Sequence, residues 1–206
     1  MSEGYEIEWK SKSILTKENF TIIYYFRDPI RYINLLGNDF YLQNLDYLRD
    51  LKNRGVDIHN LSYRQDLKSR GIDINKLLSH NLDYLCERQG KYFIIDVKSK
   101  HISNDRTKNY FYVTRNEIDV FSYYENNENI MIKILVVLKQ GESLLYRFFN
   151  WNDFILPKGF LSGKYKNTVR VKLKKNIDLS EFKKVDIGVN KADKPLVWKK
   201  WSISKK

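Results

Sequence analysis

Two strand-forming runs joined by a two-residue turn constrain this chain more than any other feature. The runs cover 81–88 and 91–98, and the second is dominated by aromatic and β-branched residues. Gln89 and Gly90 separate them, and glycine accepts the positive φ that a tight hairpin turn requires. The sequence therefore predicts a β-hairpin over 81–98, whose two strands lie side by side.

Helical and strand patterns alternate on both sides of this hairpin. Apolar residues recur at helical spacing near the N-terminus, and Thr114 with an acid three positions later predicts a capped helix. The expected helices cover 5–17 and 114–124, and the expected strands cover 20–26, 130–138 and 144–149. This order indicates an α/β fold with a core over 1–150.

The segment 28–79 lacks strand-like runs and reads as a helical insertion in the core. Residues 50–61 nearly repeat in residues 66–77, which implies two equivalent short helical units. Each unit has a glycine where a helix would end in the left-handed conformation, followed by an aspartate that could cap the next turn. These residues are Gly55 and Asp57 in the first unit and Gly71 and Asp73 in the second.

The segment 151–206 is strongly basic and reads as a β extension with a tail. It contains one expected strand, 168–173, and ends in a Trp-Lys-Lys-Trp stretch beginning at Trp198. That stretch could stack on bases or could pack on the domain or on a second subunit.

Charge and cysteine content narrow the class of protein. The chain has 37 Lys and Arg against 25 Asp and Glu, a formal net charge of +12, which favours a polyanionic partner such as nucleic acid. Cys86 is the only cysteine, so neither an internal disulfide nor a multi-cysteine zinc site is expected, and a packed core thiol is favoured. No apolar run approaches the roughly 18 residues of a membrane span. We expect an intracellular, cytoplasmic protein without membrane association, from an A+T-rich genome such as a viral or archaeal one.

Three charged residues of the hairpin form the strongest chemical pattern. Side chains two apart on a strand share a face, so Asp96 and Lys98 project together, and Asp83 on the paired strand can bring a second carboxylate near the first. Two carboxylates beside an ammonium suit Mg²⁺ or Mn²⁺, with the ammonium stabilising charge on a phosphate under attack. Solvated charges on the outer face of a hairpin are the alternative interpretation.

The order helix, strand, hairpin bearing Asp and Asp-x-Lys, helix, strand, strand resembles the PD-(D/E)xK nuclease superfamily. The Holliday-junction-resolvase-like and restriction-endonuclease-like members are the most similar, over about 1–27 and 80–150. Glu8 resembles the acid of the family's first helix, with Glu6 as the alternative. Leu82 stands where the family often has proline, and Asp96 stands where glutamate is commoner.

The resemblance implies a restriction-endonuclease-like core with a mixed central β-sheet flanked by helices. It implies that Asp83, Asp96 and Glu8 bind Mg²⁺ or Mn²⁺ and that Lys98 positions or activates the attacking water. The expected activity is that of a metal-dependent endonuclease on duplex or branched DNA, working as a homodimer because one active site cuts one strand. A non-catalytic nucleic-acid-binding protein on the same fold, and an RNA endonuclease of the cap-snatching type, are the alternatives.

Basic side chains of the repeat and of the strand end are the candidates for nucleic-acid contact. A packing role with the cations in solvent is the competing interpretation for the repeat. The candidates are Lys52, Arg54, Lys68, Arg70 and Lys100. The three histidines stand singly, which favours surface or structural roles, and His101 is the one that follows the predicted strand bearing Asp96 and Lys98.

Overall fold

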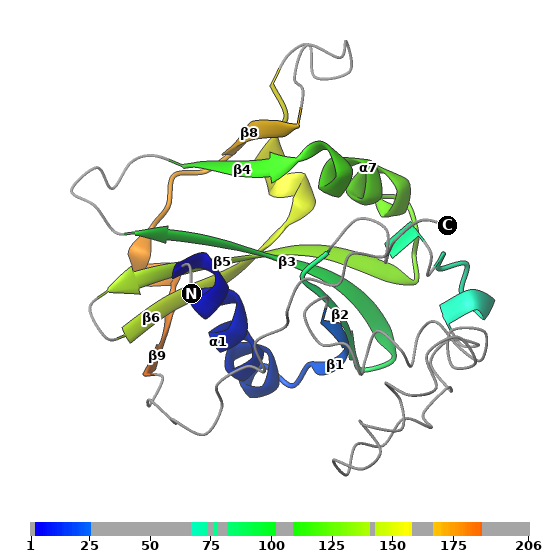
Figure 1. Ribbon diagram of the computed structural model, residues 1–206, viewed down its shortest axis with the longest axis horizontal. Coiled ribbons are helices and arrows are strands. Elements are labelled where there is room, and N and C mark those ends of the chain that lie inside the picture. The colour runs from blue at the N-terminus through cyan, green and yellow to red at the C-terminus, as the bar shows by residue number, and fades with distance from the viewer. Residues whose placement is uncertain are drawn as a thin grey trace, which may run out of the picture.

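The computed structural model describes residues 3–25, 67–73, 76–77, 82–101, 109–140, 143–157 and 167–186. It contains two β-sheets and two fully described α-helices, and residues 67–69 and 76–77 are also helical (Figure 1). The helices are α1 (Glu3–Lys17) and α7 (Arg115–Tyr124), with short 3₁₀ turns η1 (Trp151–Asp153) and η3 (Leu179–Glu181). None of the helices in the described part of the chain is long and apolar enough to cross a membrane.

The larger sheet is mixed and has six strands in the order β1-β2-β3-β5-β6-β9. Strand β3 pairs parallel with β5, and every other pair in this sheet is antiparallel. Its strands are β1 (Thr21–Tyr25), β2 (Tyr84–Arg88), β3 (Lys91–His101), β5 (Ile130–Gln140), β6 (Ser143–Asn150) and β9 (Lys183–Asp186). The predicted helices and strands of the core are therefore confirmed, with shifts of a few residues at their ends.

The predicted hairpin forms the centre of this sheet. Gln89 and Gly90 have φ values of 54° and 74°, as a turn with two left-handed residues requires. The Glu87 carboxylate accepts the backbone N–H of Gly90 at 2.6 Å, and Arg70 donates to the Gly90 carbonyl at 2.7 Å. The turn is thus held both by its own strand and by the segment that precedes the hairpin.

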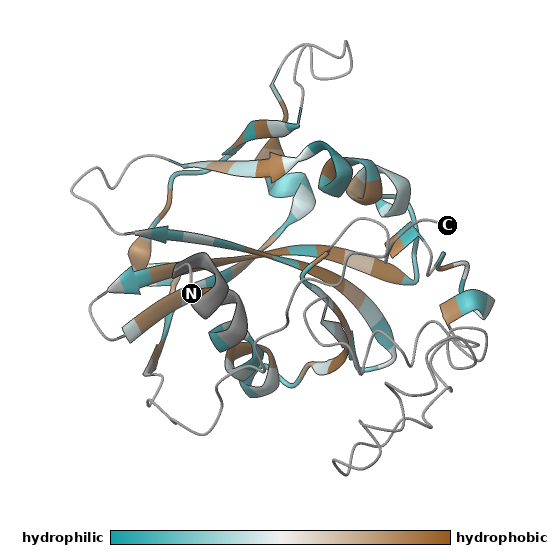
Figure 2. Cartoon of the chain, viewed as in Figure 1, coloured by the Kyte–Doolittle hydropathy of each residue, from teal (hydrophilic) through white to brown (hydrophobic). Residues whose placement is uncertain are grey.

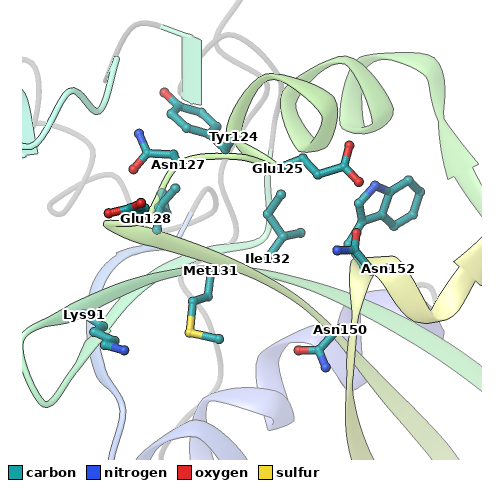
Figure 3. Close-up of a pocket in the computed structure, with 11 residues that line it drawn as sticks. Lys91, Tyr124, Glu125, Asn127, Glu128, Met131, Ile132, Asn150 and Asn152 are labelled. Carbon is teal, nitrogen blue, oxygen red and sulfur yellow. The ribbon is translucent and has the colours of Figure 1, made fainter.

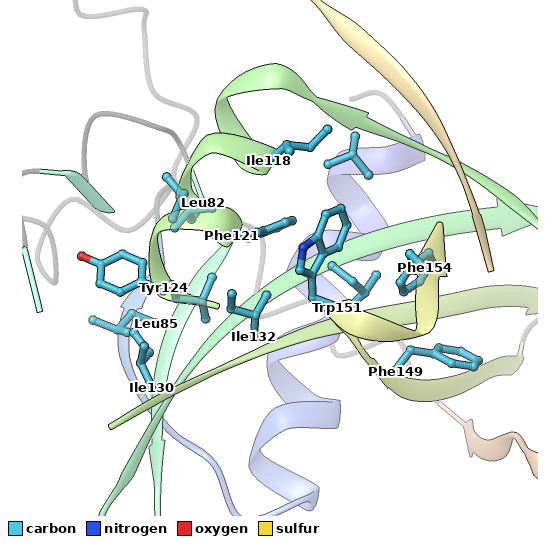
Figure 4. Packing of buried hydrophobic residues seen from close by; sticks show 14 of the residues in the cluster. Leu82, Leu85, Ile118, Phe121, Tyr124, Ile130, Ile132, Phe149, Trp151 and Phe154 are labelled. Atoms are coloured by element: carbon cyan, nitrogen blue, oxygen red, sulfur yellow. The ribbon is translucent and has the colours of Figure 1, made fainter. Parts of the chain in front are cut away.

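Successive side chains of a strand point to opposite faces of the sheet, so the core has one layer on each face. Ile95 and Val97 face α1, where they pack with Ile14 and Leu15 of the helix. Ile94 belongs to the other layer, which contains the apolar face of α7. Figure 4 shows Phe121 and Tyr124 of this helix above Leu85 and Ile132 of the sheet, and Figure 2 shows the hydrophobic stretches concentrated on the central strands.

A second sheet was not among the sequence predictions. It has three strands in the order β4-β8-β7, and it shares the α7 layer of the core through buried residues such as Phe111 and Val171. The strands are β4 (Tyr110–Thr114), β7 (Phe154–Ile155) and β8 (Thr168–Leu173). Strand β8 matches the predicted strand, whereas β4 was missed because its exposed tyrosines hide the alternation of buried and exposed positions.

Part of the repeat is described and matches its predicted conformation. Gly71 has φ 72°, and the N–H groups of Gly71 and Ile72 donate to the carbonyls of Lys68 and Leu67, which is the hydrogen-bond pattern of a helix ending in a left-handed residue. The Asp73 carboxylate accepts the N–H of Lys76 at 3.1 Å. Gly55, Asp57 and most of the insertion lie outside the described residues. The division of the chain at residue 150 stays a prediction, and β9 lies in the same sheet as the core strands.

Candidate active site

Asp83 and Asp96 lie opposite each other across the hairpin. The register pairs Tyr84 with Ile95, so the next position places Asp83 against Asp96. Asp83 precedes the first residue of β2, and its carboxylate accepts the backbone N–H of Val97 at 2.7 Å. The side chain therefore supplies the acceptor that the backbone of β2 would provide if the strand continued.

Lys98 connects the hairpin to helix α7 through two carboxylates. Its ammonium nitrogen lies 2.7 Å from Asp96 Oδ2 and 3.3 Å from Glu117 Oε1. Asp96 and Lys98 share the face of β3 that points toward α7, as the two-residue spacing predicts. The ammonium is thus held between the strand and the first turn of the helix.

Burial makes the ionisation of Asp96 costly. The side chain is 1% exposed, and Asp83 is 8% exposed. Burial raises the pKa of Asp96 to about 6, against the lowering effect of the Lys98 charge and with a further rise from the Glu117 charge. Burial by itself lowers the pKa of Lys98, but the charges of Asp96, Glu117 and Asp83 outweigh it and raise this pKa above its ordinary value.

Glu117 is the site residue that sequence reasoning missed. The sequence predicts it as the acid of a capping box, and that role is confirmed, because its Oε2 accepts the N–H of Thr114 at 2.6 Å and Thr114 Oγ1 accepts the N–H of Glu117. Its other oxygen contacts Lys98, which follows from how α7 packs on this face of the sheet. Spacing along the chain holds no signal of that contact.

The four side chains fit a divalent cation by charge and by chemistry. Three carboxylates stand against one ammonium, so the cluster has an excess of negative charge. Asp96 Oδ2 is buried, and its contact with the Lys98 ammonium is an ion pair without hydrogen-bond geometry. In the described residues no three acidic, histidine or cysteine side chains converge to form a metal cage. Mg²⁺ commonly uses one or two protein carboxylates and fills its shell with water and phosphate oxygens, so Asp83 and Asp96 suffice as its protein ligands.

The outcomes for the other predicted site residues differ. Glu8 belongs to α1, which packs on the opposite face of the sheet, and its predicted role as a ligand stays a prediction. Arg70 donates to the hairpin turn and lies over the ring of Tyr92, which supports the packing interpretation for this residue. Lys100 lies over the Phe111 ring, with 5.4 Å between its nitrogen and the ring centroid.

Lys68 is exposed, so contact with a polyanion is open to it. Lys52, Arg54, His59 and His80 lie outside the described residues. Cys86 is buried in the core, which confirms the packed thiol predicted for it.

A hollow of about 440 Å³ lies at the other end of α7 (Figure 3). Tyr124 and Glu125 from the helix end, Met131 and Ile132 from β5, and Asn150 from β6 border it. Glu117 stands at the first turn of the same helix and does not line it, so the hollow is separate from the acidic cluster.

Comparison with known proteins gives little beyond this geometry. No protein-family model and no curated protein sequence matches the chain. Among solved structures, Hjc of Archaeoglobus fulgidus, a Holliday junction resolvase from an archaeal hyperthermophile, is similar with a TM-score of 0.29 and 12% identity. The similarity covers 48% of this chain and 75% of that chain. A TM-score at this level does not establish a shared fold, so the functional argument depends on the side chains described above.

Proposed function

We propose that the chain is a metal-dependent nuclease that hydrolyses phosphodiester bonds in DNA, as an endonuclease on duplex or branched substrates. The observation that supports this most is the pairing of Asp83 and Asp96 across the hairpin, with the Lys98 ammonium 2.7 Å from Asp96. Two buried carboxylates beside a lysine are a costly arrangement for stability alone, because burial penalises each charge. Ionisable groups with strongly shifted pKa values are common at functional sites, where the chemistry requires them despite their cost to stability.

Each residue of the cluster has a role in this proposal. Asp83 and Asp96 hold a Mg²⁺ or Mn²⁺ ion, which when bound withdraws charge from a phosphate oxygen and makes water nucleophilic near neutral pH. Lys98 stabilises the negative charge that develops on the phosphate and orients the attacking water. Glu117 contacts Lys98 from helix α7, so that the ammonium would keep its position when Asp96 also binds the metal ion.

The basic composition of the chain supports a nucleic acid as the substrate. A net charge of +12 attracts a polyanion toward an acidic cluster that would otherwise repel it. Glu8 is proposed to complete the metal shell or to support it from helix α1, and assembly as a homodimer is proposed for cutting both strands of a duplex or junction.

Cleavage assays with matched variants test this function. Linear, flapped and four-way DNA, and RNA of the same sequence, are incubated with Mg²⁺ or Mn²⁺ and with wild type, Asp96→Asn, Lys98→Met or Glu8→Gln. Asp119→Asn serves as the control, because Asp119 is an exposed acid on the same helix as Glu117. We expect cleavage of DNA by wild type and the control, and a loss of at least about 100-fold in the Asp96 and Lys98 variants.

Three outcomes would contradict the proposal in whole or in part. Equal cleavage by wild type, Asp96→Asn and Lys98→Met would place the active site elsewhere. Tight, metal-independent binding of DNA without cleavage of any substrate would favour the non-catalytic binding protein. Cleavage confined to RNA would retain the site and change the substrate class.

A further inference from the structure

The three-stranded sheet β4-β8-β7 has one buried face and one exposed face. Along β4 the buried residues are Phe111 and Val113, and along β8 they are Val169, Val171 and Leu173, which all join the core. The alternate residues of both strands face outward. These outward residues are Tyr110, Tyr112 and Thr114 on β4, and Thr168, Arg170 and Lys172 on β8.

Tyrosines and cations interleave on this exposed face. The register pairs Tyr110 with Lys172 and Tyr112 with Arg170. The Arg170 guanidinium lies 4.7 Å from the centroid of the Tyr110 ring, and the Lys172 nitrogen lies 5.9 Å from the same centroid. No carboxylate stands among the outward residues of these two strands, so the face is both aromatic and positively charged.

Tyr112 is the most open aromatic group of this face. Its side chain is 65% exposed, and among the described residues no ring or cation lies against it. A tyrosine on a strand would usually gain stability by packing on a neighbour. The exposed ring instead presents a flat surface to a base, and Arg170, its cross-strand partner, supplies a nearby cation for the phosphate beside that base.

The spacing of the two tyrosines favours unpaired bases over duplex. Residues two apart on a strand are separated by roughly 7 Å, twice the rise of about 3.4 Å per nucleotide in stacked duplex. The bases of a duplex are covered by their neighbours and cannot stack on a protein ring, whereas unpaired bases can. The face therefore suits a single strand whose bases are spread apart.

Strand β4 leads directly to the candidate active site. It ends at Thr114, whose N–H donates to Glu117, and Glu117 contacts Lys98. In Figure 1 β4 and β8 lie side by side and β4 runs straight into α7. The strand is five residues long, so its whole exposed row lies within roughly 17 Å of the helix that borders the cluster.

We propose that the exposed face of β4 and β8, centred on Tyr110, Tyr112, Arg170 and Lys172, binds a single-stranded segment of nucleic acid beside the active site. The binding surface stands on its own geometry, while its use in choosing a substrate depends on the nuclease function proposed above. A substrate with an unpaired arm next to the cleavage point is then preferred to a fully paired one.

Binding without metal tests the surface independently of cleavage. The fluorescence anisotropy of a labelled oligothymidylate of about 15 nucleotides is measured in EDTA, together with that of a mixed-sequence duplex of equal length. We expect Tyr112→Ala to weaken single-strand binding about ten-fold and to leave duplex binding nearly unchanged, while Tyr112→Phe retains the affinity of wild type. Arg170→Gln should weaken single-strand binding and reduce its dependence on salt.

Tyr123→Ala is the matched control for these variants. Tyr123 is 53% exposed near the far end of α7, and the Lys76 nitrogen lies 3.8 Å from its ring centroid, so it has similar chemistry away from the proposed face. Its substitution should leave single-strand binding unchanged. An equal loss in Tyr112→Ala and Tyr123→Ala, an equal loss for single strand and duplex, or no loss at all would overturn the proposal.

Cleavage assays separate this proposal from the nuclease function. If the active-site variants abolish cleavage but Tyr112→Ala binds single strands like wild type, the surface is wrong and the nuclease function stands. If Tyr112→Ala loses single-strand binding while no substrate is cut, the surface stands and the nuclease function is wrong. If both hold, Tyr112→Ala should lower cleavage of flapped DNA relative to blunt duplex.

Discussion

The Asp83 carboxylate accepts a 2.7 Å hydrogen bond from the backbone N–H of Val97, the residue between Asp96 and Lys98. This one contact aligns the end of β2 with the part of β3 that bears the other two charged residues. It also fixes one oxygen of Asp83 beside Asp96 and Lys98, so the same carboxylate has a structural role and, in the proposed function, a metal-binding role. The first prediction follows from this double use of the side chain.

Asp83→Asn and Asp83→Ala should separate the structural role of Asp83 from its proposed catalytic role. Asparagine can still accept the Val97 N–H, so Asp83→Asn should change the free energy of unfolding by less than about 1 kcal/mol. Asp83→Ala leaves a buried N–H without an acceptor and should cost about 1–3 kcal/mol. Denaturant unfolding measures stability and the plasmid-nicking rate measures activity, which both variants should lose. Full activity in Asp83→Asn would remove Asp83 from the site.

Asp96 should make the stability of the metal-free protein fall as pH rises. Its pKa is about 6 in the folded protein, against an ordinary value of 3.8, so the folded state holds this proton more tightly than the unfolded state. Its contribution is complete below about pH 4 and is lost as pH rises through about 6, with a size on the order of 3 kcal/mol. Unfolding by urea in EDTA from pH 4 to pH 7.5 measures this change.

Asp96→Asn is the variant that isolates this titration. The difference in stability between wild type and Asp96→Asn should change across that pH window, because asparagine does not titrate. Parallel curves for the two proteins would contradict the raised pKa. Addition of Mg²⁺ at pH 7.5 should raise the melting temperature of wild type and have little effect on Asp96→Asn, since the ion binds the ionised carboxylate.

Glu117→Gln should shift the titration of Asp96 while preserving the helix. Glutamine keeps the capping-box hydrogen bonds with Thr114, so helix α7 should retain its stability. The Glu117 charge contributes to the raised pKa of Asp96, and its removal should move the pH of the stability change downward. Glu117→Ala should also lose the cap, at a cost of about 1 kcal/mol. An unchanged midpoint in Glu117→Gln would show that the two carboxylates do not interact.

Glu18, the residue after helix α1, connects the end of this helix to strands β6 and β9. Its Oε1 accepts hydrogen bonds from the Tyr146 hydroxyl at 2.7 Å and from the Lys183 ammonium at 2.6 Å. Burial raises the pKa of Glu18, but these two bonds and the charges of Lys183 and Arg88 together outweigh it and lower the pKa below its ordinary value. The stabilisation is therefore present above the ordinary pKa of a glutamate and is lost as pH falls through the lowered value.

Glu18→Gln and Tyr146→Phe test this connection. Each should lower the free energy of unfolding at pH 7 by about 1 kcal/mol, and the effect of Glu18→Gln should shrink at acidic pH. Glu128→Gln, which changes an exposed acid in the turn before β5, is the control and should be neutral. A loss in the control equal to that in Glu18→Gln would point to net charge and not to the specific bonds.

Local chemistry in the sequence determined the hairpin, the capped helix and the shared face of Asp96 and Lys98. The turn at Gln89 and Gly90 needs only two residues that accept positive φ, and the capping box needs only Thr114 and Glu117 at fixed spacing. The facing of alternate side chains follows from the pleat of any strand. Such features depend on neighbours along the chain, so the pattern of residues is enough to predict them.

Only the tertiary structure decided the contacts between distant segments. Glu117 meets Lys98 because α7 packs on one layer of the sheet, and Tyr110 and Tyr112 share an exposed face with Arg170 because β4 pairs with β8. These pairings join segments separated by long stretches of chain, and their register is set by which side chains the core can bury together. The sequence therefore predicted Asp83, Asp96 and Lys98 as site residues, whereas packing placed Glu117 against Lys98 and formed the exposed face of β4 and β8.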